Sequence, residues 1–549
     1  MASIIDDLKG LQSETQPDKK AELLKNVRND IEADVGAFLK EATGYVLKAP
    51  DTKPATNLAV GTAGENSRQT WKNCVENQVV QPLQYLHPKT YQELLAIVNF
   101  AKANSLKVKA IGSGHSFSDI VQTTDLLIDT HELKGVIPLD ASLIKPGVET
   151  STLFHVECGI TIHDLNSALE QKGLALLNMG GYDAQTIIGA TSTATHGSGI
   201  TLGPLSSSIV SIVLISDEGV TYRIEPSAGI TDRAKYMHEY PTNVLVQDDD
   251  WFNAVTVGMG CLGVVYSVIL RVAKLYYLSE TRVISDWDAV RNDLAEGSVL
   301  DKYRHYEVLV NPYAIDGKHT CMVTMRDIAD KPTKPIWDRP HRNFFSELIS
   351  AIPDIEKGLL FLFDTFPEVA PYLINEAMKS LEDAGYVNVW YKILNIGTAN
   401  DISAYSAEVG FPMTTFIDAV EDILAMAERM RESGKVYLTS PFSLRFVKKS
   451  DAFLAMQEGR DTCMIEMPTI NGTFAGFNIL RQYETLMYKH SGRPHWGQVN
   501  HLTGSHDFIR TMYPKYDRWM QVYKQLNKNG MFDNSFTDRC GFSSQTFGG

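Results

Sequence analysis

A single histidine stands in a short glycine-bordered stretch directly after a predicted strand. Residues 108–111 read Val-Lys-Ala-Ile and predict the strand, and residues 112–116 read Gly-Ser-Gly-His-Ser. The glycines at positions 112 and 114 leave no side chain in the way, so backbone N–H groups can approach an anionic group closely. Tight turns also use glycine for steric reasons alone, so a Gly-x-Gly pair is weak evidence by itself. With His115 beside it, the loop fits a phosphate-bearing cofactor.

A second glycine-rich segment, residues 180–199, is dense in small and hydroxyl-bearing side chains. A packed core element would carry Leu or Phe over such a length. We therefore interpret this segment as backbone that lies along a long polar ligand. A third glycine-rich stretch, residues 258–263, precedes a strand predicted over residues 266–272.

The composition points to small-molecule chemistry rather than to nucleic acid or an anionic membrane surface. The 549 residues carry a formal net charge of -15. Proteins that bind nucleic acid or an anionic membrane instead carry clustered Lys and Arg. A chain of this length predicts two or three domains. The six cysteines contain no C-x-x-C pair, so neither a metal site nor a dense disulfide framework is indicated.

The N-terminus lacks the basic start and apolar core of a signal peptide. No apolar run approaches the roughly 18 residues of a membrane-spanning helix. We therefore expect a cytoplasmic protein without a membrane span.

Apolar residues recur at intervals of three and four between positions 20 and 48 and predict one amphipathic helix. Its apolar face consists of Leu24, Val27, Ile31, Val35 and Phe38. Such a face must be buried, either against the main body of the protein or in a contact between two copies of the chain. Residues 55–68 are polar and glycine-rich and predict a linker.

The elements around the first glycine loop predict an α+β domain. Thr90 and Glu93 have the spacing of a capping box at the start of an amphipathic helix that ends before Lys107. After the glycine loop, a strand is predicted over residues 152–158 and a helix that ends at Gly173.

The chain changes character from about residue 276 onward. Residues 344–381 have a helical pattern that prolines interrupt, and they contain a bulky apolar patch at residues 359–363. That patch predicts domain core; the alternative is an apolar lid or a wall for a lipophilic substrate. Two strands are predicted over residues 441–447 and 462–468, and the last helix is predicted over residues 505–526.

Three separated segments together resemble the vanillyl-alcohol-oxidase (PCMH-type) family of FAD flavoproteins, in its aldonolactone oxidase and alditol oxidase branch. They are residues 112–116, residues 193–199 (Thr-Ala-Thr-His-Gly-Ser-Gly) and residues 492–497 (Gly-Arg-Pro-His-Trp-Gly). The tail from Tyr513 to residues 530–534 is also similar. The resemblance implies an α+β fold, in which a two-subdomain FAD-binding domain carries an inserted α+β substrate domain, the cap.

The resemblance also implies where the domains begin and end. The implied units are a helical extension and linker over residues 1–65, the FAD-binding domain over 66–275, the cap over 276–490, and a segment over 491–549 that returns to the FAD-binding domain.

The resemblance further implies how FAD is held. His115 matches the position that family members link covalently to the flavin C8-methyl group, and a neutral imidazole nitrogen is a suitable nucleophile. His196 is expected to brace its glycine loop. The other implied cofactor-binding residues are Ile111, Gly112, Ser113, Gly114, Ser116, Gly180, Gly181, Thr186, Gly189, Ala190, Thr193, Gly197 and Val265.

Gly180 matches a family position beside the reactive edge of the flavin, where a bulkier residue is associated with poor access of oxygen. The resemblance therefore favours an oxidase, which reduces molecular oxygen to hydrogen peroxide, over a dehydrogenase with another acceptor.

Hydride transfer from an alcohol carbon to flavin requires removal of the hydroxyl proton and a positive group nearby. The relatives supply a Glu-x-Arg pattern and a His-Trp-x-Lys pattern, and this chain departs from both. The first pattern reads Ser443-Leu444-Arg445, which keeps the arginine and lacks the carboxylate. The second reads His495-Trp496-Gly497-Gln498, in which an uncharged amide replaces the lysine.

Strand alternation places Ser443 and Arg445 on one face, and Arg445 is expected to point at substrate. In the next strand Glu466 would be costly to bury unpaired, so we predict that it interacts with Arg445. Our hypothesis is that Glu466 replaces the missing carboxylate as base or orienting group; the alternative is a surface or purely structural ion pair. Gln498 can hydrogen-bond flavin or substrate, and His495 can act as acid, base or hydrogen-bond donor or serve packing.

We therefore predict an FAD-dependent oxidase that acts on an alcohol carbon of a sugar, lactone or polyol, with oxygen as its second substrate. Two alternatives stay open: the same chemistry on a bulkier lipophilic alcohol such as a sterol or a biosynthetic intermediate, and a flavoprotein with degenerate catalysis. A nicotinamide-linked dehydrogenase is disfavoured, because the glycine loops lack an ordered G-x-G-x-x-G with a distant acidic partner.

Overall fold

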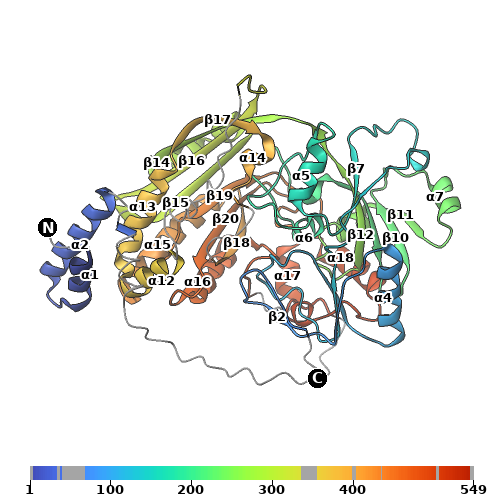
Figure 1. Cartoon of the computed structure of the whole chain (residues 1–549), viewed down its shortest axis with the longest axis horizontal. Coiled ribbons are helices and arrows are strands. Elements are labelled where there is room, and N and C mark those ends of the chain that lie inside the picture. Colours follow the sequence, from blue (N-terminus) through green and yellow to red (C-terminus); the bar gives the residue numbers. More distant parts are fainter. Residues whose placement is uncertain are drawn as a thin grey trace.

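The computed structural model describes residues 4–33, 38–39, 69–334, 355–397, 403–434, 436–501 and 506–543. Within them the chain forms an elongated molecule with two halves, each built around β-sheet (Figure 1). The half on the right of Figure 1 carries the glycine loops, and an eight-stranded sheet forms the other half. None of the described helices is both long enough and apolar enough to cross a bilayer.

The first glycine loop follows a small parallel sheet of strand order β3-β5-β4, comprising β3 (Gln84–Leu86), β4 (Val108–Ile111) and β5 (Leu126–Asp129). Helix α4 (Tyr91–Ala103) joins β3 to β4, and the Thr90 side chain caps it by accepting the N–H of Glu93 at 3.2 Å. The Glu93 carboxylate accepts the N–H of Lys89 at 2.6 Å instead of that of Thr90. The predicted cap is confirmed, but only one of the two capping-box bonds forms.

A six-stranded sheet of order β11-β10-β9-β12-β7-β6 forms most of this half. Its strands are β6 (Val136–Ile137), β7 (Leu153–Glu157), β9 (Ile209–Ile215), β10 (Thr221–Glu225), β11 (Val244–Gln247) and β12 (Val264–Arg271). The helices of this half include α5 (Ile162–Glu170), α6 (Ile187–Ser192), α7 (Arg233–Glu239) and α8 (Asp249–Val255). Two small sheets pair β1 (Trp71–Lys72) with β2 (Val79–Val80), and β8 (Leu174–Ala175) with β13 (Ala273–Lys274).

The second glycine-rich segment contains the short helix α6, which the sequence analysis did not predict. The Thr186 side chain caps this helix by accepting the N–H of Gly189 at 3.2 Å. Ile187 and Ala190, which belong to this helix, are buried. The small residues of this segment therefore allow a helix to pack closely as well as leaving bare backbone.

The second half is an eight-stranded antiparallel sheet of order β17-β14-β16-β15-β19-β20-β18-β21. Its strands are β14 (Tyr277–Asp286), β15 (His305–Ile315), β16 (Lys318–Ala329), β17 (Asp383–Val389), β18 (Ala404–Pro412), β19 (Phe442–Val447), β20 (Thr462–Ile470) and β21 (Arg493–Pro494). The helices of this half include α9 (Trp287–Glu296), α10 (Ser298–Lys302), α14 (Trp390–Leu394), α15 (Phe416–Gly434) and α16 (Gly476–Lys489). The two strands predicted around positions 441–447 and 462–468 are therefore confirmed as β19 and β20.

The apolar face of the N-terminal helix is buried within the same chain. Helices α1 (Ile4–Ser13) and α2 (Pro17–Ala33) pack against α12 (Ile355–Thr365) and α13 (Ala370–Ser380) at one end of the molecule (Figure 1). The predicted packing on the main body is confirmed for Leu24, Val27, Ile31 and Phe38. Val35 and the part of the predicted helix beyond Leu39 lie outside the described residues. Residues 34–37 and 40–68, which include the predicted linker, lie outside the described residues.

The bulky patch at residues 359–363 is part of that same core. Leu359, Leu362 and Phe363 are buried in one cluster with Val27 and Ile31 of α2. None of the five patch residues lines the large cavity described below. The interpretation as domain core is confirmed, and that as a lid or substrate wall is wrong. The helical pattern over residues 344–354 lies outside the described residues.

The last helix is split in two. The sequence predicts one helix over residues 505–526, but α17 (His506–Met512) and α18 (Tyr516–Leu526) are separate, with Pro514 between them. Proline has no N–H to donate and its ring clashes with the preceding turn, so a helix cannot run through it without a break. The prediction of one continuous helix is therefore wrong at Pro514.

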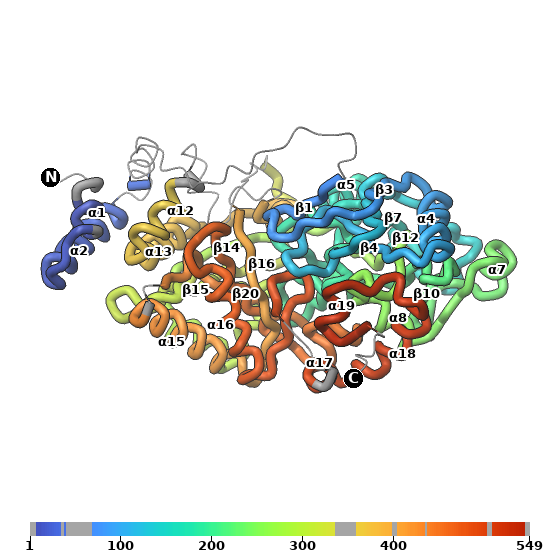
Figure 2. The backbone as a smooth tube through the Cα atoms, turned by 90° about the horizontal axis from the view of Figure 1, so that it is seen from below, coloured from blue at the N-terminus to red at the C-terminus, as the bar shows by residue number. Residues whose placement is uncertain are grey.

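The C-terminal segment lies against the half that carries the glycine loops. Helix α18 packs on α8, and α19 (Ser535–Arg539) lies on the same side (Figure 2). Two backbone bonds join the segments: Val108 N–H to Met531 O at 2.9 Å and Asp217 N–H to Leu526 O at 3.1 Å. The residue boundaries given for the domains stay a prediction.

Candidate active site

One cavity of about 410 Å³ lies between the glycine loops and the eight-stranded sheet. Every residue that the sequence analysis named as catalytic or cofactor-binding lines this cavity. One wall consists of the loops after β4, around α6 and before β12. The opposite wall, called the cap wall below, consists of side chains from β14, β15, β16, β18, β19 and β20. Most of these side chains are polar, and apolar ones such as Leu309 and Met322 lie among them.

The loop wall is built from backbone that side chains would displace. A Cβ at position 112 would lie 2.1 Å from Thr186 Oγ1, so only glycine lets the first loop approach the cap of α6. Gly114 has φ +71°, a conformation that favours glycine. The resulting bare surface beside Ser113 and Ser116 suits the long polar chain of a dinucleotide. The residues present therefore fit FAD along this wall.

His115 is held at this wall by bonds between two distant segments. The N–H of Phe117 donates to Gly497 O at 2.7 Å, and Ser118 Oγ donates to Trp496 O at 2.7 Å. These bonds clamp the loop that carries His115 to the 495–497 turn. Burial lowers the pKa of His115, so its imidazole is neutral at neutral pH and retains a nucleophilic nitrogen.

The protonation of His495 is set by its neighbours. Its Nδ1 accepts the N–H of Gly497 at 3.1 Å, so the proton of the neutral ring resides on Nε2, which lies 3.5 Å from Thr195 Oγ1. Burial lowers the pKa of His495 to about 4. At neutral pH such an imidazole is uncharged and only a weak base, so it can still donate a hydrogen bond from its neutral Nε2–H.

The predicted contact between Arg445 and Glu466 is present, with Arg445 Nη2 3.3 Å from Glu466 Oε2. Ser443 and Arg445 share the face of β19 that lines the cavity, as strand alternation predicts. Glu466 Oε1 also lies 2.9 Å from Ser406 Oγ, which is 2.6 Å from Gln498 Oε1. Burial raises the pKa of Glu466, against the opposing effect of Arg445.

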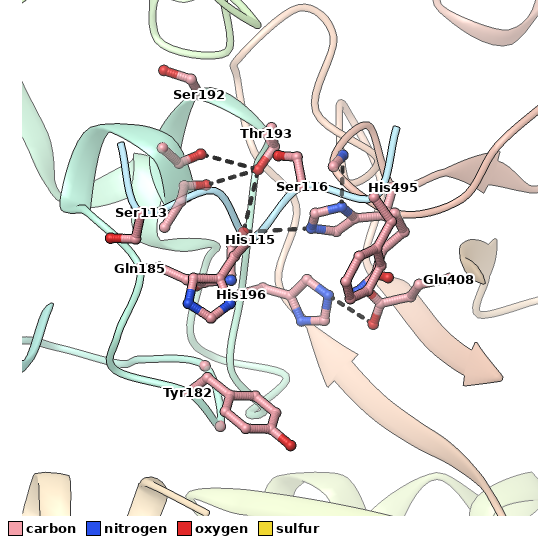
Figure 3. A pocket seen from close by; sticks show the side chains of 18 of the residues that line it. Ser113, His115, Ser116, Tyr182, Gln185, Ser192, Thr193, His196, Glu408 and His495 are labelled. Carbon is pink, nitrogen blue, oxygen red and sulfur yellow. Dashed lines mark hydrogen bonds and ion pairs between the residues drawn. The ribbon is translucent and has the colours of Figure 1, made fainter. Parts of the chain in front are cut away.

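Sequence reasoning missed Glu408, which lies on β18 directly across the ladder from Glu466. His196 Nδ1 donates to Gly197 O at 2.8 Å, as the expected bracing role requires, and its Nε2 lies 3.1 Å from Glu408 Oε1. The two side chains point toward each other across the cavity wall (Figure 3). Although burial opposes it, the neighbouring His196 lowers the pKa of Glu408 to about 2. Glu408 is the one charged residue of the strand at residues 404–412, and this was the available signal.

A second missed group lies at the far side of the cap wall. Arg326 Nε bonds Glu280 Oε2 at 2.6 Å, and Arg326 Nη1 lies 3.0 Å from Glu307 Oε2. Glu307 is paired with Arg445 across the ladder, so this network continues into the catalytic candidates. Nearby, the buried Ser443 Oγ has no hydrogen-bond partner among the described residues, which leaves it available to a ligand.

A fold with two bare glycine loops beneath a polar cap sheet defines an FAD-binding flavoprotein. Residues 82–225 match the family model of the FAD binding domain, and residues 268–540 match that of D-arabinono-1,4-lactone oxidase. The chain belongs to the aldonolactone oxidase branch of the vanillyl-alcohol-oxidase flavoproteins and is an FAD-dependent oxidoreductase that acts on CH–OH groups.

Relatives match nearly end to end. L-gulono-1,4-lactone dehydrogenase of Mycobacterium tuberculosis is 29% identical over 85% of this chain and 98% of its own. L-gulonolactone oxidase of Bos taurus is 26% identical over 83% and 95%. Among solved structures, cholesterol oxidase from Brevibacterium sterolicum has a TM-score of 0.68 at 14% identity and covers 86% of this chain and 96% of its own, which shows a shared fold.

Proposed function

We propose that this protein oxidises a hydroxyl-bearing carbon of a sugar-derived 1,4-lactone or a similar polyol, with FAD attached to His115 and with oxygen as acceptor. One observation carries the proposal: Ser443, where the family pattern has its carboxylate, is paired across the ladder with Glu466, which also contacts Arg445. The carboxylate lost from β19 is therefore replaced by one on the neighbouring strand. The site is rearranged rather than degenerate.

The bound FAD supplies the hydride acceptor, and the protein supplies proton transfer and charge. Glu466 takes the hydroxyl proton of the substrate at its carboxylate, which its raised pKa makes a stronger base than an ordinary glutamate. Arg445 stabilises the negative charge that develops on the substrate oxygen. Gln498, Ser443 and His495 orient the other oxygens of the substrate by hydrogen bonds.

A polyhydroxylated substrate suits the cap wall better than a sterol does. Charged and hydroxyl side chains from Arg282, Glu307, Thr324, Arg326 and Ser406 line it. The hydroxyl groups of a sugar-derived ligand can hydrogen-bond to these side chains, whereas the ring system of a sterol cannot. The apolar patch that suggested a lipophilic alcohol is buried elsewhere. The two relatives named above, a lactone dehydrogenase and a lactone oxidase, support the same choice.

Oxygen as acceptor rests on Gly180, which lines the cavity beside His196 and Thr195. A Cβ there would lie 3.3 Å from His196 O and 3.5 Å from Thr195 Cγ2, which is tight but tolerable. An alanine can therefore be introduced to probe access without rebuilding the loop.

The test is an anaerobic and aerobic screen of the purified holoprotein. L-gulono-1,4-lactone and D-arabinono-1,4-lactone should bleach the flavin absorbance without oxygen and yield hydrogen peroxide with it, whereas cholesterol should do neither. Bleaching by cholesterol but by neither lactone would mean that the substrate is a lipophilic alcohol and not a sugar-derived lactone. Bleaching with reoxidation only by an artificial dye would make the protein a dehydrogenase, and no bleaching by any alcohol would favour degenerate catalysis.

A further inference from the structure

Lys109 is a buried cation without an anionic partner. Its side chain is only 2% exposed, yet the residue lines the cavity beside the glycine loops. An ammonium group has three N–H donors. Among the described residues it makes one hydrogen bond, of 3.4 Å to Gly260 O, and no ion pair.

The carboxylates that act on Lys109 are engaged elsewhere. Asp119 pairs with Arg539 at 2.7 Å. Asp533 accepts hydrogen bonds from Tyr523 and, at 2.7 Å, from Asn527. Neither carboxylate forms a hydrogen bond or an ion pair with Lys109 among the described residues.

The remaining titratable neighbours are not anionic. Burial raises the pKa of the Cys261 thiol to about 11, so it stays protonated at neutral pH. Lys107, on the same strand side, donates to Gly530 O at 2.5 Å and adds positive charge. Burial lowers the pKa of Lys109 itself.

An unpaired buried ammonium group destabilises the protein that contains it, and fully buried lysines are rare unless they are paired. The cavity side of Lys109 is the direction from which a partner can come. Lys109 stands three residues before Gly112 on β4, and Gly260 belongs to the glycine-rich stretch before β12. The ammonium group therefore lies where two bare loops meet at the wall that fits FAD.

We propose that Lys109 binds the diphosphate of FAD and that this diphosphate is its missing counter-ion. A phosphate oxygen beside the ammonium group forms a charge-assisted hydrogen bond in a water-poor setting, where such a bond is strong. The glycine loops supply the close approach, and Lys109 supplies the charge that these loops lack.

The proposal predicts opposite changes in stability and in affinity for Lys109→Met. Both are measured in a His115→Ala background, so that the flavin exchanges freely. The affinity for FAD should fall about tenfold to a hundredfold, because a hydrogen bond to a charged group is lost. The affinity for riboflavin, which has no phosphate, should change less than about twofold. The melting temperature of the apoprotein should rise, because methionine is buried without the cost of a desolvated amine or ammonium group.

Lys107→Met in the same background is the matched control, because it removes a lysine two positions away that does not line the cavity. It should leave the ratio of FAD to riboflavin affinity unchanged. Equal losses for FAD and riboflavin in Lys109→Met, together with a lower melting temperature of the apoprotein, would mean that Lys109 is structural and would overturn the proposal.

A second measurement does not depend on the folding of the Lys109 variant. ADP carries the diphosphate without the flavin, so its binding to the His115→Ala apoprotein should be coupled to uptake of about one proton at pH values above the lowered pKa of Lys109. Calorimetry in buffers of different ionisation enthalpy measures this uptake. ADP binding without proton uptake at any pH from about 7 to 10, or no ADP binding at all, would overturn the proposal.

Discussion

The two walls of the cavity hold their ligands by different means. The loop wall offers bare backbone from residues 112–116 and 180–199, and its glycines are dictated by close approach, as at Gly112 against Thr186. The cap wall offers side chains whose partners come from neighbouring strands, as Glu466 meets Arg445 and stands opposite Glu408. A Cβ at position 112 would collide with Thr186, whereas a side-chain wall can move a carboxylate from one strand to the next. One departure from the family pattern, Ser443, lies in the cap wall, and the other, Gln498, lies in the turn that follows β21.

The largest effect should come from Glu466→Gln, which removes the proposed base from the cap wall while keeping its shape. The rate of flavin reduction by a lactone under anaerobic conditions should fall about a hundredfold or more. Stopped-flow absorbance measures it. Thr462→Ser, on the same strand and away from the cavity, is the control. If the rate of flavin reduction in Glu466→Gln lies within about threefold of the rate in the unsubstituted protein, Glu466 is not the base.

The pH profile of the same rate sharpens this test. The base must be ionised, and burial raises the pKa of Glu466, so flavin reduction should decline with falling pH at a higher pH than the ordinary value near 4.3 for glutamate. This acid limb should be absent from Glu466→Gln. An unchanged limb in that variant would assign the titration to another group.

The loop wall is tested next, by His115→Ala. Acid precipitation should release the flavin into the supernatant, whereas the unsubstituted protein should keep its yellow colour in the pellet. Turnover should fall by about tenfold, a smaller loss than for Glu466→Gln, because bare backbone still holds the cofactor. Colour that stays in the pellet of His115→Ala would place the covalent link elsewhere.

Gly180→Ala should separate the two half-reactions. We expect reoxidation by oxygen to slow about tenfold while reduction by substrate changes less than about twofold, because the added methyl group fits against His196 O with a small shift. Stopped-flow mixing of reduced protein with oxygen and with a dye measures each. Equal slowing with oxygen and dye would point to a distorted loop instead of blocked access.

The smallest effect on activity should come from Leu362→Ala, outside both walls. This side chain of α12 is fully buried in one cluster with the N-terminal helices, so the free energy of unfolding should fall by about 2 to 5 kcal/mol. The turnover of the folded protein should stay unchanged. Denaturant unfolding and steady-state kinetics measure the two quantities, and a large loss of turnover would tie the N-terminal helices to the site.

The sequence by itself determined the loop wall, the class of cofactor and most elements. Glycine spacing around His115 and His196 is a local signal. The backbone conformation and the close approach that a glycine permits are properties of that glycine itself and do not depend on distant segments. Strand alternation likewise placed Ser443 and Arg445 on one face. The apolar residues at intervals of three and four, among them Val27 and Ile31, predicted a buried helix face.

Only the tertiary structure decided which side chains meet. Glu408 and Glu466 are 58 residues apart, and they stand opposite each other because of the register between β18 and β20, which no local pattern specifies. The same holds for Arg326 and Glu307 and for the lone ammonium group of Lys109 beside Gly260. Register, burial and charge pairing depend on distant segments, so the sequence shows that polar residues are present but not what they contact.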